Sequence, residues 1–219
     1  MSAKTATLIG ATGMIGGELL QQLLNDPYFS NVRVLVRRPF NMEHPKLQKK
    51  LVDFNDADSL LVALDGSEVV FVAVGTTQKK VKGDREAYRK VDYDIPVNIA
   101  RYCKMAGCKI FILVSSIGAN SKSNNFYLKL KGEAEDTIMK TQIETVHIMQ
   151  PSMLLGNRDE FRFGEKIGSP LMKIFSFLIP SKYRAIKAKD VAKAMLAASK
   201  QEEKGFFVYE NKEIKKMTN

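Results

Sequence analysis

The sequence has no tryptophan, and only two of its 219 residues are cysteine. Two cysteines are too few for a small disulfide-stapled scaffold. Cys103 and Cys108 also lack the second ligand pair of a zinc site and the C-x-x-C spacing of a redox motif. We therefore expect free thiols in a reducing cytoplasm and no metal site.

Long apolar runs are also missing. No stretch reaches the roughly 18 consecutive apolar residues that a membrane-spanning helix needs. The apolar N-terminal stretch is interrupted by Gly10 and Gly13 and is followed by no cleavage pattern of small residues. We expect neither a membrane span nor a signal peptide.

Acidic residues are scarce relative to basic ones: 24 Asp and Glu stand against 34 Lys and Arg, a formal net charge of +10. A basic surface attracts phosphates of any kind, including those of nucleic acid. The basic segments 79–90 and 182–193 have no platform of interleaved aromatic side chains. We therefore expect a solvated basic face, and nucleic acid is not the expected partner. His44, in a polar loop, and His147, in an alternating strand, suggest no metal site.

The sequence alternates regularly between apolar strand patterns and amphipathic helix patterns. Strands are expected near residues 6–9, 32–36, 50–53, 69–74, 109–114, 145–149 and 206–209. Helices are expected near residues 14–24, 56–64, 84–105, 124–140 and 189–199. Unbroken apolar strands suit a parallel sheet that helices cover on both faces. The pattern predicts an α/β fold with a doubly wound parallel sheet.

We expect a single domain, because no linker is long enough to divide the chain. Residues 1–155 would form the core. The irregular stretch 156–188, with an apolar helical piece near 171–179, would form a small C-terminal cap on the substrate side. Residues 189–219 would add a terminal helix and strand.

A glycine-rich turn, G-x-x-G-x-x-G, lies between the first expected strand and the first expected helix. Glycines at such a turn let backbone amides approach a pyrophosphate, and the positive helix N-terminus faces the same charge. The turn therefore predicts a dinucleotide site. The residues expected to bind the cofactor here are Gly10, Thr12, Gly13, Met14, Ile15 and Gly16.

The end of the second expected strand indicates which dinucleotide is bound. NAD sites commonly have an Asp or Glu there for the ribose hydroxyls, whereas a phosphorylated ribose calls for arginine. This chain has Arg37 and Arg38 with no acid beside them. A guanidinium can bind a 2′-phosphate with two hydrogen bonds and stack on adenine. The arginines favour NADPH over NAD, the alternative being two solvated side chains at a strand end.

Two later strand ends should complete the cofactor cleft, because ligands bind beyond the carboxyl ends of parallel strands. Asp53 and Phe54 end the third strand, where the acid would accept from the adenine amino group. Val74, Gly75 and Thr76 end the fourth, where the glycine allows close approach to adenine and ribose.

The fifth strand ends in Ser115 and Ser116, and Tyr127 and Lys131 follow at helical i, i+4 spacing. Hydride transfer to or from a carbonyl needs a proton exchanged at the oxygen, and an ordinary tyrosine, with a pKa of about 10, does this poorly. A nearby ammonium stabilises the phenolate, and a serine hydroxyl can hold the substrate oxygen. These four residues are the expected catalytic set.

Taken together, these motifs resemble the atypical short-chain dehydrogenase/reductases, and within them an NAD(P)H-binding branch. The segments that carry the resemblance are residues 10–16, Arg37-Arg38, residues 74–77, residues 114–119, residues 127–133 and Gln150-Pro151. The resemblance implies a Rossmann fold and NADPH binding. It also implies that Tyr127 exchanges the proton, Lys131 holds the nicotinamide ribose and tunes Tyr127, and one serine orients the carbonyl. Ser116 is preferred as that serine, since it is nearer the turn.

Residues after the sixth strand could close over the nicotinamide or the phosphates. Met153, Leu154 and Arg162 are the residues expected to do so. Arg158 is a further candidate, and both arginines have the alternative of being solvated loop charges.

The expected function is that of a cytoplasmic NADPH-dependent oxidoreductase of a small carbonyl or alcohol. One alternative is a dinucleotide-bound regulatory or interaction protein with weak or no turnover. Another is an enzyme like the nucleoside-diphosphate-sugar epimerases, which share the Y-x-x-x-K arrangement. The C-terminal part here is far shorter than theirs, so a large nucleotide-sugar is the less expected substrate.

Overall fold

The computed structural model describes residues 4–155 and 184–218. Its main feature is a parallel seven-stranded sheet with strand order β3-β2-β1-β4-β5-β6-β9. The strands are β1 (Thr5–Ile9), β2 (Asn31–Val36), β3 (Leu47–Leu51), β4 (Val69–Val72), β5 (Ile110–Val114), β6 (Thr145–Gln150) and β9 (Gly205–Glu210). The predicted doubly wound parallel sheet is confirmed.

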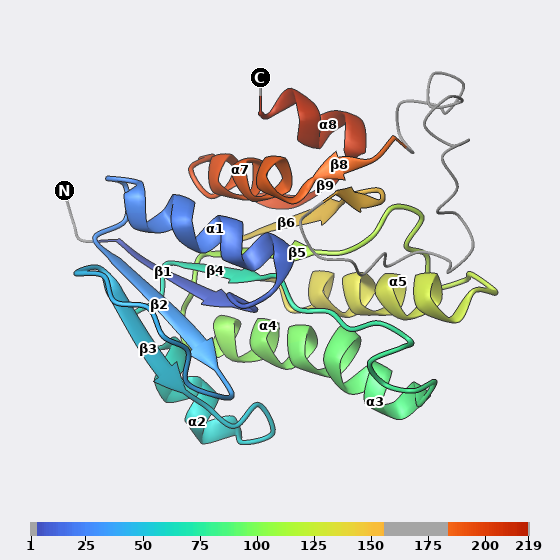
Figure 1. Cartoon of the computed structure of the whole chain (residues 1–219), viewed down its shortest axis with the longest axis horizontal. Helices are drawn as coiled ribbons and strands as arrows, with labels where there is room; N and C mark the ends of the chain where they lie inside the picture. Colours follow the sequence, from blue (N-terminus) through green and yellow to red (C-terminus); the bar gives the residue numbers. More distant parts are fainter. Residues whose placement is uncertain (1–3, 156–183, 219) are drawn as a thin grey trace.

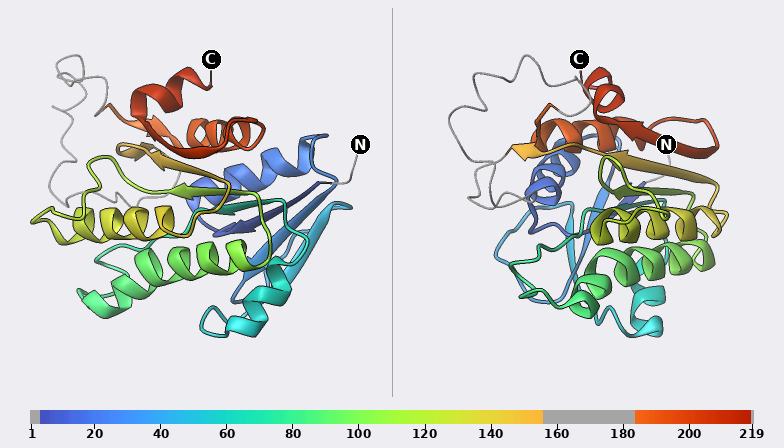
Figure 2. Two further views of the ribbon diagram at one scale, coloured as in Figure 1. Left: turned by 180° about the vertical axis from the view of Figure 1, so that it is seen from behind. Right: turned by 90° about the vertical axis from the view of Figure 1, so that its right-hand side faces the viewer.

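Helices cover both faces of the sheet (Figures 1 and 2). On one face lie α1 (Met14–Asn25), α7 (Ala188–Ala198) and α8 (Asn211–Lys216). On the other lie α2 (Ala57–Leu64), α4 (Ile95–Met105) and α5 (Phe126–Met139). The short helix α3 (Arg85–Arg89) precedes α4, with a π-helical turn, η1 (Lys90–Asp94), between them.

Strand β4 shows why its sequence is apolar without interruption. Val69 and Phe71 belong to the core beneath α1 and α7, whereas Val70 and Val72 belong to the core beneath α2 and α4. All four side chains are at most 2% exposed. A strand buried on both faces needs apolar residues at both alternating sets of positions.

Strand order reverses at β1, whose neighbours are β2 on one side and β4 on the other. Successive crossovers therefore run to opposite sides of β1. A crevice opens beyond the carboxyl ends of the strands at such a switch point, and ligands of this class of sheet bind there.

The third strand is earlier than predicted: β3 covers Leu47–Leu51 rather than residues 50–53. It is an edge strand that pairs only with β2 within the described sheet, and four of its five residues are exposed. Charged residues are usual on exposed edges, so apolar periodicity gives little signal there. Asp53 and Phe54 therefore follow the strand by two and three residues.

The C-terminal part contains elements that the sequence did not predict. Two short strands, β7 (Leu154–Leu155) and β8 (Ile186–Lys187), pair in parallel, and α8 follows β9. The predicted strand 206–209 is confirmed as β9, at the sheet edge beside β6. The apolar piece 171–179 and most of the expected cap lie outside the described residues.

Cys103 and Cys108 are buried free thiols at the end of α4. The Cys108 N–H donates to the Cys103 carbonyl at 2.9 Å, and Gly107 between them has a φ of +75°. This is the geometry of a Schellman motif, in which the two flanking side chains pack together. The C-x4-C spacing thus forms a helix end. In the described part of the chain, no helix is long and apolar enough to span a membrane.

Candidate functional site

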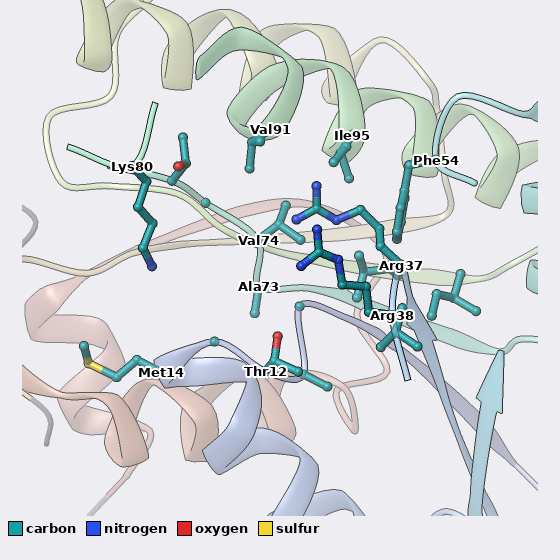
Figure 3. A pocket seen from close by; sticks show the side chains of 18 of the residues that line it. Thr12, Met14, Arg37, Arg38, Phe54, Ala73, Val74, Lys80, Val91 and Ile95 are labelled. Atoms are coloured by element: carbon teal, nitrogen blue, oxygen red, sulfur yellow. The ribbon is translucent and has the colours of Figure 1, made fainter. Parts of the chain in front are cut away.

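A cleft of about 770 Å³ opens at the carboxyl ends of the strands, where the strand order reverses (Figure 3). Its walls are the glycine turn before α1, the segments after β2 and β4, and side chains of η1 and α4. Volumes of a few hundred to 1,000 Å³ are typical of cofactor and substrate sites. Ten of the predicted cofactor residues line it: Gly10, Thr12, Gly13, Met14, Arg37, Arg38, Phe54, Val74, Gly75 and Thr76.

Two glycines of the turn have no room for a side chain. Gly10 has a φ of +94°, and a Cβ there would lie 2.6 Å from the Ala73 carbonyl oxygen. A Cβ on Gly16 would lie 2.0 Å from the carbonyl oxygen of Gly10. The chain can therefore pass close to β4 and turn into α1 only with glycine at both positions.

The start of α1 offers its backbone amides to the cleft. The N-cap is Gly13, which has no side chain to accept from these amides, and the first turn of the helix holds no acidic residue. The first N–H groups of a helix have no partner within the helix, and the helix dipole adds positive potential there. A diphosphate fits this position.

Three of the cofactor residues predicted at the glycine turn and after the third strand do not line the cleft. Ile15 is 4% exposed and packs in the core, and Gly16 serves close packing against Gly10. The Asp53 carboxylate accepts hydrogen bonds from the backbone and side-chain amides of Asn55, at 2.9 and 3.0 Å. Asp53 thereby forms a turn, and only its neighbour Phe54 reaches the cleft.

Arg37 and Arg38 extend into the cleft from the end of β2 (Figure 3). Lys80, which sequence reasoning had placed on a solvated face, is a third cation in the lining. No carboxylate lines the cleft in the part of the chain that the structure describes. An anionic ligand is therefore favoured over a neutral one.

Tyr127 and Lys131 lie one turn apart at the start of α5. The side chain of Asn125 caps that helix by accepting from the Tyr127 and Leu128 amides, at 3.0 and 3.1 Å. A Cβ on Gly132 would lie 2.2 Å from the Ser121 nitrogen. The missing side chain lets α5 approach the loop after β5, which brings its first turns to the strand end that carries the serines.

Lys131 is buried, and its ammonium lies 2.9 Å from Oδ1 of Asp92. The other carboxylate oxygen of Asp92 accepts the backbone N–H of Thr76 at 2.7 Å. Asp92 is 2% exposed and lies in η1. It therefore connects the lysine of α5 to the cofactor cleft, because Thr76 lines that cleft.

Sequence reasoning missed Asp92, although a signal existed. A lysine turned toward a sheet is buried, and a buried ammonium needs a counter-charge. An acid in the preceding helix was the natural candidate. π-turns such as η1 also occur often at functional sites, but no residue type announces them.

Tyr88 is a second residue that the sequence did not single out. Its hydroxyl donates to the Thr76 carbonyl at 3.1 Å, and its ring meets the ring of Tyr127 edge-on, with centroids 6.1 Å apart. Neither Tyr127 nor Lys131 is in the described lining of the cleft. Each is linked to Thr76 by one intervening residue. The Tyr127 ring contacts Tyr88, and the Lys131 ammonium pairs with Asp92.

The two serines have different surroundings. The Ser115 hydroxyl donates to Glu135, whose carboxylate also accepts from Gln150 Nε2 at 3.0 and 2.9 Å. Burial raises the pKa of Glu135, while these hydrogen bonds and the Lys131 charge oppose the rise. In the described part of the chain, the Ser116 hydroxyl donates only to the Ile117 carbonyl, at 3.4 Å. Ser115 is thus committed to a buried network, which leaves Ser116 the preferred candidate for holding a substrate oxygen.

The remaining predicted residues lie beyond β6. The Met153 carbonyl accepts from Ile186, and Leu154 begins β7. Neither lines the cleft in the described part of the chain. Arg158 and Arg162 lie outside the described residues.

The histidines are not site residues. His147 is fully buried and packs against Phe207 and Tyr209, with Nδ1 3.1 Å from the Tyr209 hydroxyl. Burial lowers its pKa to about 4. Nδ1 of His44 accepts the Lys46 amide at 3.1 Å. Among the described residues no cluster of His, Cys, Asp and Glu could hold a metal ion.

A family model described as NAD(P)H-binding matches residues 10–202. The chain belongs to this family. The nicotinamide dinucleotide cofactor and the resemblance inferred from the sequence motifs are both confirmed at that level.

Two relatives of this NAD(P)H-binding chain are similar over most of their length. Rat protein HTATIP2 is 34% identical over 168 residues, which are 75% of this chain and 69% of the relative. Protein FMP52, mitochondrial, of Candida albicans is 33% identical over 157 residues, 70% of this chain and 68% of the relative.

Solved structures show the same fold at low identity. A UDP-N-acetylglucosamine 4-epimerase from Methanobrevibacter ruminantium has a TM-score of 0.71 at 18% identity, covering 96% of this chain and 77% of that one. The uronate dehydrogenase from Agrobacterium tumefaciens has a TM-score of 0.71 at 13% identity, covering 95% and 76%. MoeE5 in complex with UDP-glucose and NAD has a TM-score of 0.69 at 16% identity, covering 98% and 80%. At these identities the likeness concerns the fold.

Proposed function

We propose that this protein is an NADPH-dependent oxidoreductase that reduces a small carbonyl compound or oxidises the corresponding alcohol. The observation that carries the proposal is the pair of arginines at the end of β2, in a cleft whose described lining has no carboxylate. When bound, NADPH would supply the hydride. The chain itself then has to bind the dinucleotide, orient the substrate and move one proton.

Binding is divided among three groups of the cleft. The first turn of α1 offers backbone amides to the diphosphate. Arg37 and Arg38 are suited to a 2′-phosphate, which a guanidinium can bind with two parallel hydrogen bonds. Phe54, from the loop after β3, adds an aromatic wall on the same side of the cleft, suited to adenine (Figure 3).

Proton transfer falls to α5. Tyr127 would exchange its hydroxyl proton with the substrate oxygen, and the Lys131 ammonium would stabilise the phenolate and hold the nicotinamide ribose. Asp92 positions Lys131 through the 2.9 Å ion pair. Ser116 would donate to the substrate oxygen and hold it toward Tyr127.

Two alternatives share this cofactor site. A nucleotide-sugar epimerase would need a large sugar-nucleotide site in addition to the dinucleotide cleft. Most of the predicted substrate-side cap, residues 156–183, lies outside the described residues. A regulatory protein would bind the dinucleotide without turnover. Assays for carbonyl reduction and for UDP-glucose epimerisation distinguish the three. The oxidoreductase should show the first activity, the epimerase the second and the regulatory protein neither.

Calorimetric titration with NADPH and NADH tests the cofactor assignment. Wild type should bind NADPH at least about tenfold more tightly, because hydrogen bonds to a charged group contribute about 1.5–3 kcal/mol. The double variant Arg37→Gln, Arg38→Gln should lose most of that preference while keeping its affinity for NADH. Arg101→Gln, a remote exposed arginine on α4, is the matched control. Equal affinity of wild type for both cofactors would overturn the NADPH assignment.

A cytoplasmic location is part of the proposal, and its support is that Cys103 and Cys108 are free thiols, which are usual in a reducing compartment. The FMP52 relatives carry the word mitochondrial in their names. Fractionation of cells that express a C-terminally tagged chain separates the two locations, and recovery in mitochondria would contradict the cytoplasmic one.

A further inference from the structure

Positive charge enters the cofactor cleft at two separate places. Arg37 and Arg38 enter at the end of β2, and Lys80 enters from the loop that follows β4 (Figure 3). The Lys80 side chain points into the cleft on the side of Met14, where α1 begins. Lys80 therefore faces the start of α1 from across the cleft, apart from the two arginines.

The backbone around Lys80 is held by a series of hydrogen bonds. The Lys80 amide donates to Thr77 Oγ1 at 3.2 Å, and the Val81 amide donates to the Thr77 carbonyl at 3.2 Å. The loop turns back at Lys82 and Gly83, whose φ angles are +51° and +81°. The Gly83 amide donates to the Gln78 carbonyl at 3.0 Å. These hydrogen bonds fix the backbone from which the Lys80 side chain extends, on the cleft wall opposite the glycine turn.

The start of the same loop is fixed to the site. Both polar groups of the Thr76 backbone are held, the N–H by Asp92 at 2.7 Å and the carbonyl by the Tyr88 hydroxyl at 3.1 Å. Lys80 follows Thr76 by four positions in the chain. The loop that carries Lys80 is thus anchored by the same residues that contact Lys131 and Tyr127.

The two positions of positive charge match the chemistry of one ligand. NADPH has two separate anionic groups, a diphosphate between the nucleosides and a phosphate on the adenosine ribose, whereas NADH has only the diphosphate. A helix N-terminus contributes roughly half a unit charge, too little to balance a diphosphate alone. An ammonium on the opposite wall supplies a full compensating charge.

We propose that Lys80 is a diphosphate-binding residue of this cleft, which it closes from the side opposite the amides of α1, and that Arg37 and Arg38 bind the ribose phosphate. This inference rests on the proposed dinucleotide function and adds a residue to it. Lys80 acts on the part of the ligand that NADPH and NADH share. The arginines act on the part that distinguishes them.

The test compares Lys80→Gln with Lys79→Gln, its exposed neighbour, which is not in the described lining and carries the same charge. Each variant is titrated calorimetrically with NADPH, NADH and ADP-ribose, which retains the diphosphate but lacks the nicotinamide. Lys80→Gln should weaken all three by the same factor, about tenfold, and Lys79→Gln by less than about twofold. The slope of log affinity against log salt should also fall for Lys80→Gln.

Three results would overturn the proposal. A loss no larger than that of Lys79→Gln would leave Lys80 without a role in binding. Loss for NADPH alone would assign Lys80 to the ribose phosphate, and unchanged ADP-ribose binding would assign it to the nicotinamide end.

Failure of the broader proposal has a different signature. If wild type binds NADPH and NADH equally, the NADPH assignment fails, yet an equal loss in Lys80→Gln still supports the diphosphate role. If wild type binds none of the three probes, both proposals fail.

Discussion

The ammonium of Lys131 lies 2.9 Å from Asp92, and Asp92 also holds the Thr76 amide at 2.7 Å. One carboxylate thus contacts both the helix with the proton-transfer residues and the loop that lines the cofactor cleft. Both charged side chains are at most 5% exposed. An ion pair at this depth is stable only as a complete pair, because either charge alone would be buried without compensation.

Asp92→Asn should lower both stability and turnover. Loss of the carboxylate leaves Lys131 buried without its charge partner, which costs about 3 kcal/mol or more in unfolding free energy. We expect kcat for carbonyl reduction to fall much more than the KM for NADPH rises, because the effect is on Lys131. Urea denaturation and steady-state kinetics measure the two quantities.

Two further variants distinguish loss of the ion pair from a general loss of stability. Asp94 lies in the same turn, but within the described residues its carboxylate pairs only with Arg89, at 3.8 Å. Asp94→Asn should therefore change stability by less than about 1 kcal/mol. The double variant Asp92→Asn, Lys131→Met removes both charges and should be more stable than Asp92→Asn alone. A double variant as unstable as the sum of the two single variants would contradict the ion-pair account.

The glycine turn predicts a clear contrast among neighbouring glycines. Gly16→Ala places a Cβ 2.0 Å from the Gly10 carbonyl oxygen and should prevent stable folding or cost several kcal/mol. Gly17→Ala, one residue later, places its Cβ at an ordinary 3.5 Å and should stabilise α1 by about 0.5–1 kcal/mol. Thermal denaturation compares them, and similar melting temperatures for the two variants would be inconsistent with the turn geometry.

His147 makes stability depend on pH. Burial lowers its pKa to about 4 from 6.5, so the unfolded chain takes up this proton at higher pH than the folded chain. Its contribution is therefore complete above about pH 6.5, falls as the pH drops, and is lost below about 4, a change of about 3 kcal/mol.

His147→Phe tests this dependence. Phenylalanine keeps a ring against Phe207 and Tyr209 and removes Nε2, which has no hydrogen-bond partner among the described residues. The difference in unfolding free energy between variant and wild type should increase in favour of the variant between pH 6.5 and 4. A difference independent of pH would show that His147 does not titrate in this range.

The parts of the fold that are encoded locally were predictable from sequence. The alternation in β4 reflects burial on both faces, and Gly10 and Gly16 fit positions where no Cβ fits. Strand β3 was misplaced because an exposed edge strand is defined by its hydrogen bonds to β2, and its Lys49 and Lys50 leave no apolar pattern.

Most residues of the site were predictable from the sequence, but their hydrogen-bond and ion-pair partners were not. Ser115 and Ser116 have the same chemistry in sequence, and only the buried Glu135 beside Ser115 distinguishes them. Asp92 is near Lys131 because a π-turn and a helix meet in space, 39 positions apart in the chain. Tertiary pairings of this kind have no signature in one sequence.

The central claim is that this chain transfers hydride with Tyr127 as the proton-exchanging group, and the most direct measurement is NADPH oxidation across a panel of small aldehydes and ketones. Wild type should turn over at least one of them. Tyr127→Phe should lower kcat at least about a hundredfold with unchanged NADPH affinity, whereas Tyr93→Phe, which loses only a 3.0 Å contact to Thr137, should stay within about twofold. No turnover by wild type, or an undiminished rate in Tyr127→Phe, would contradict the account.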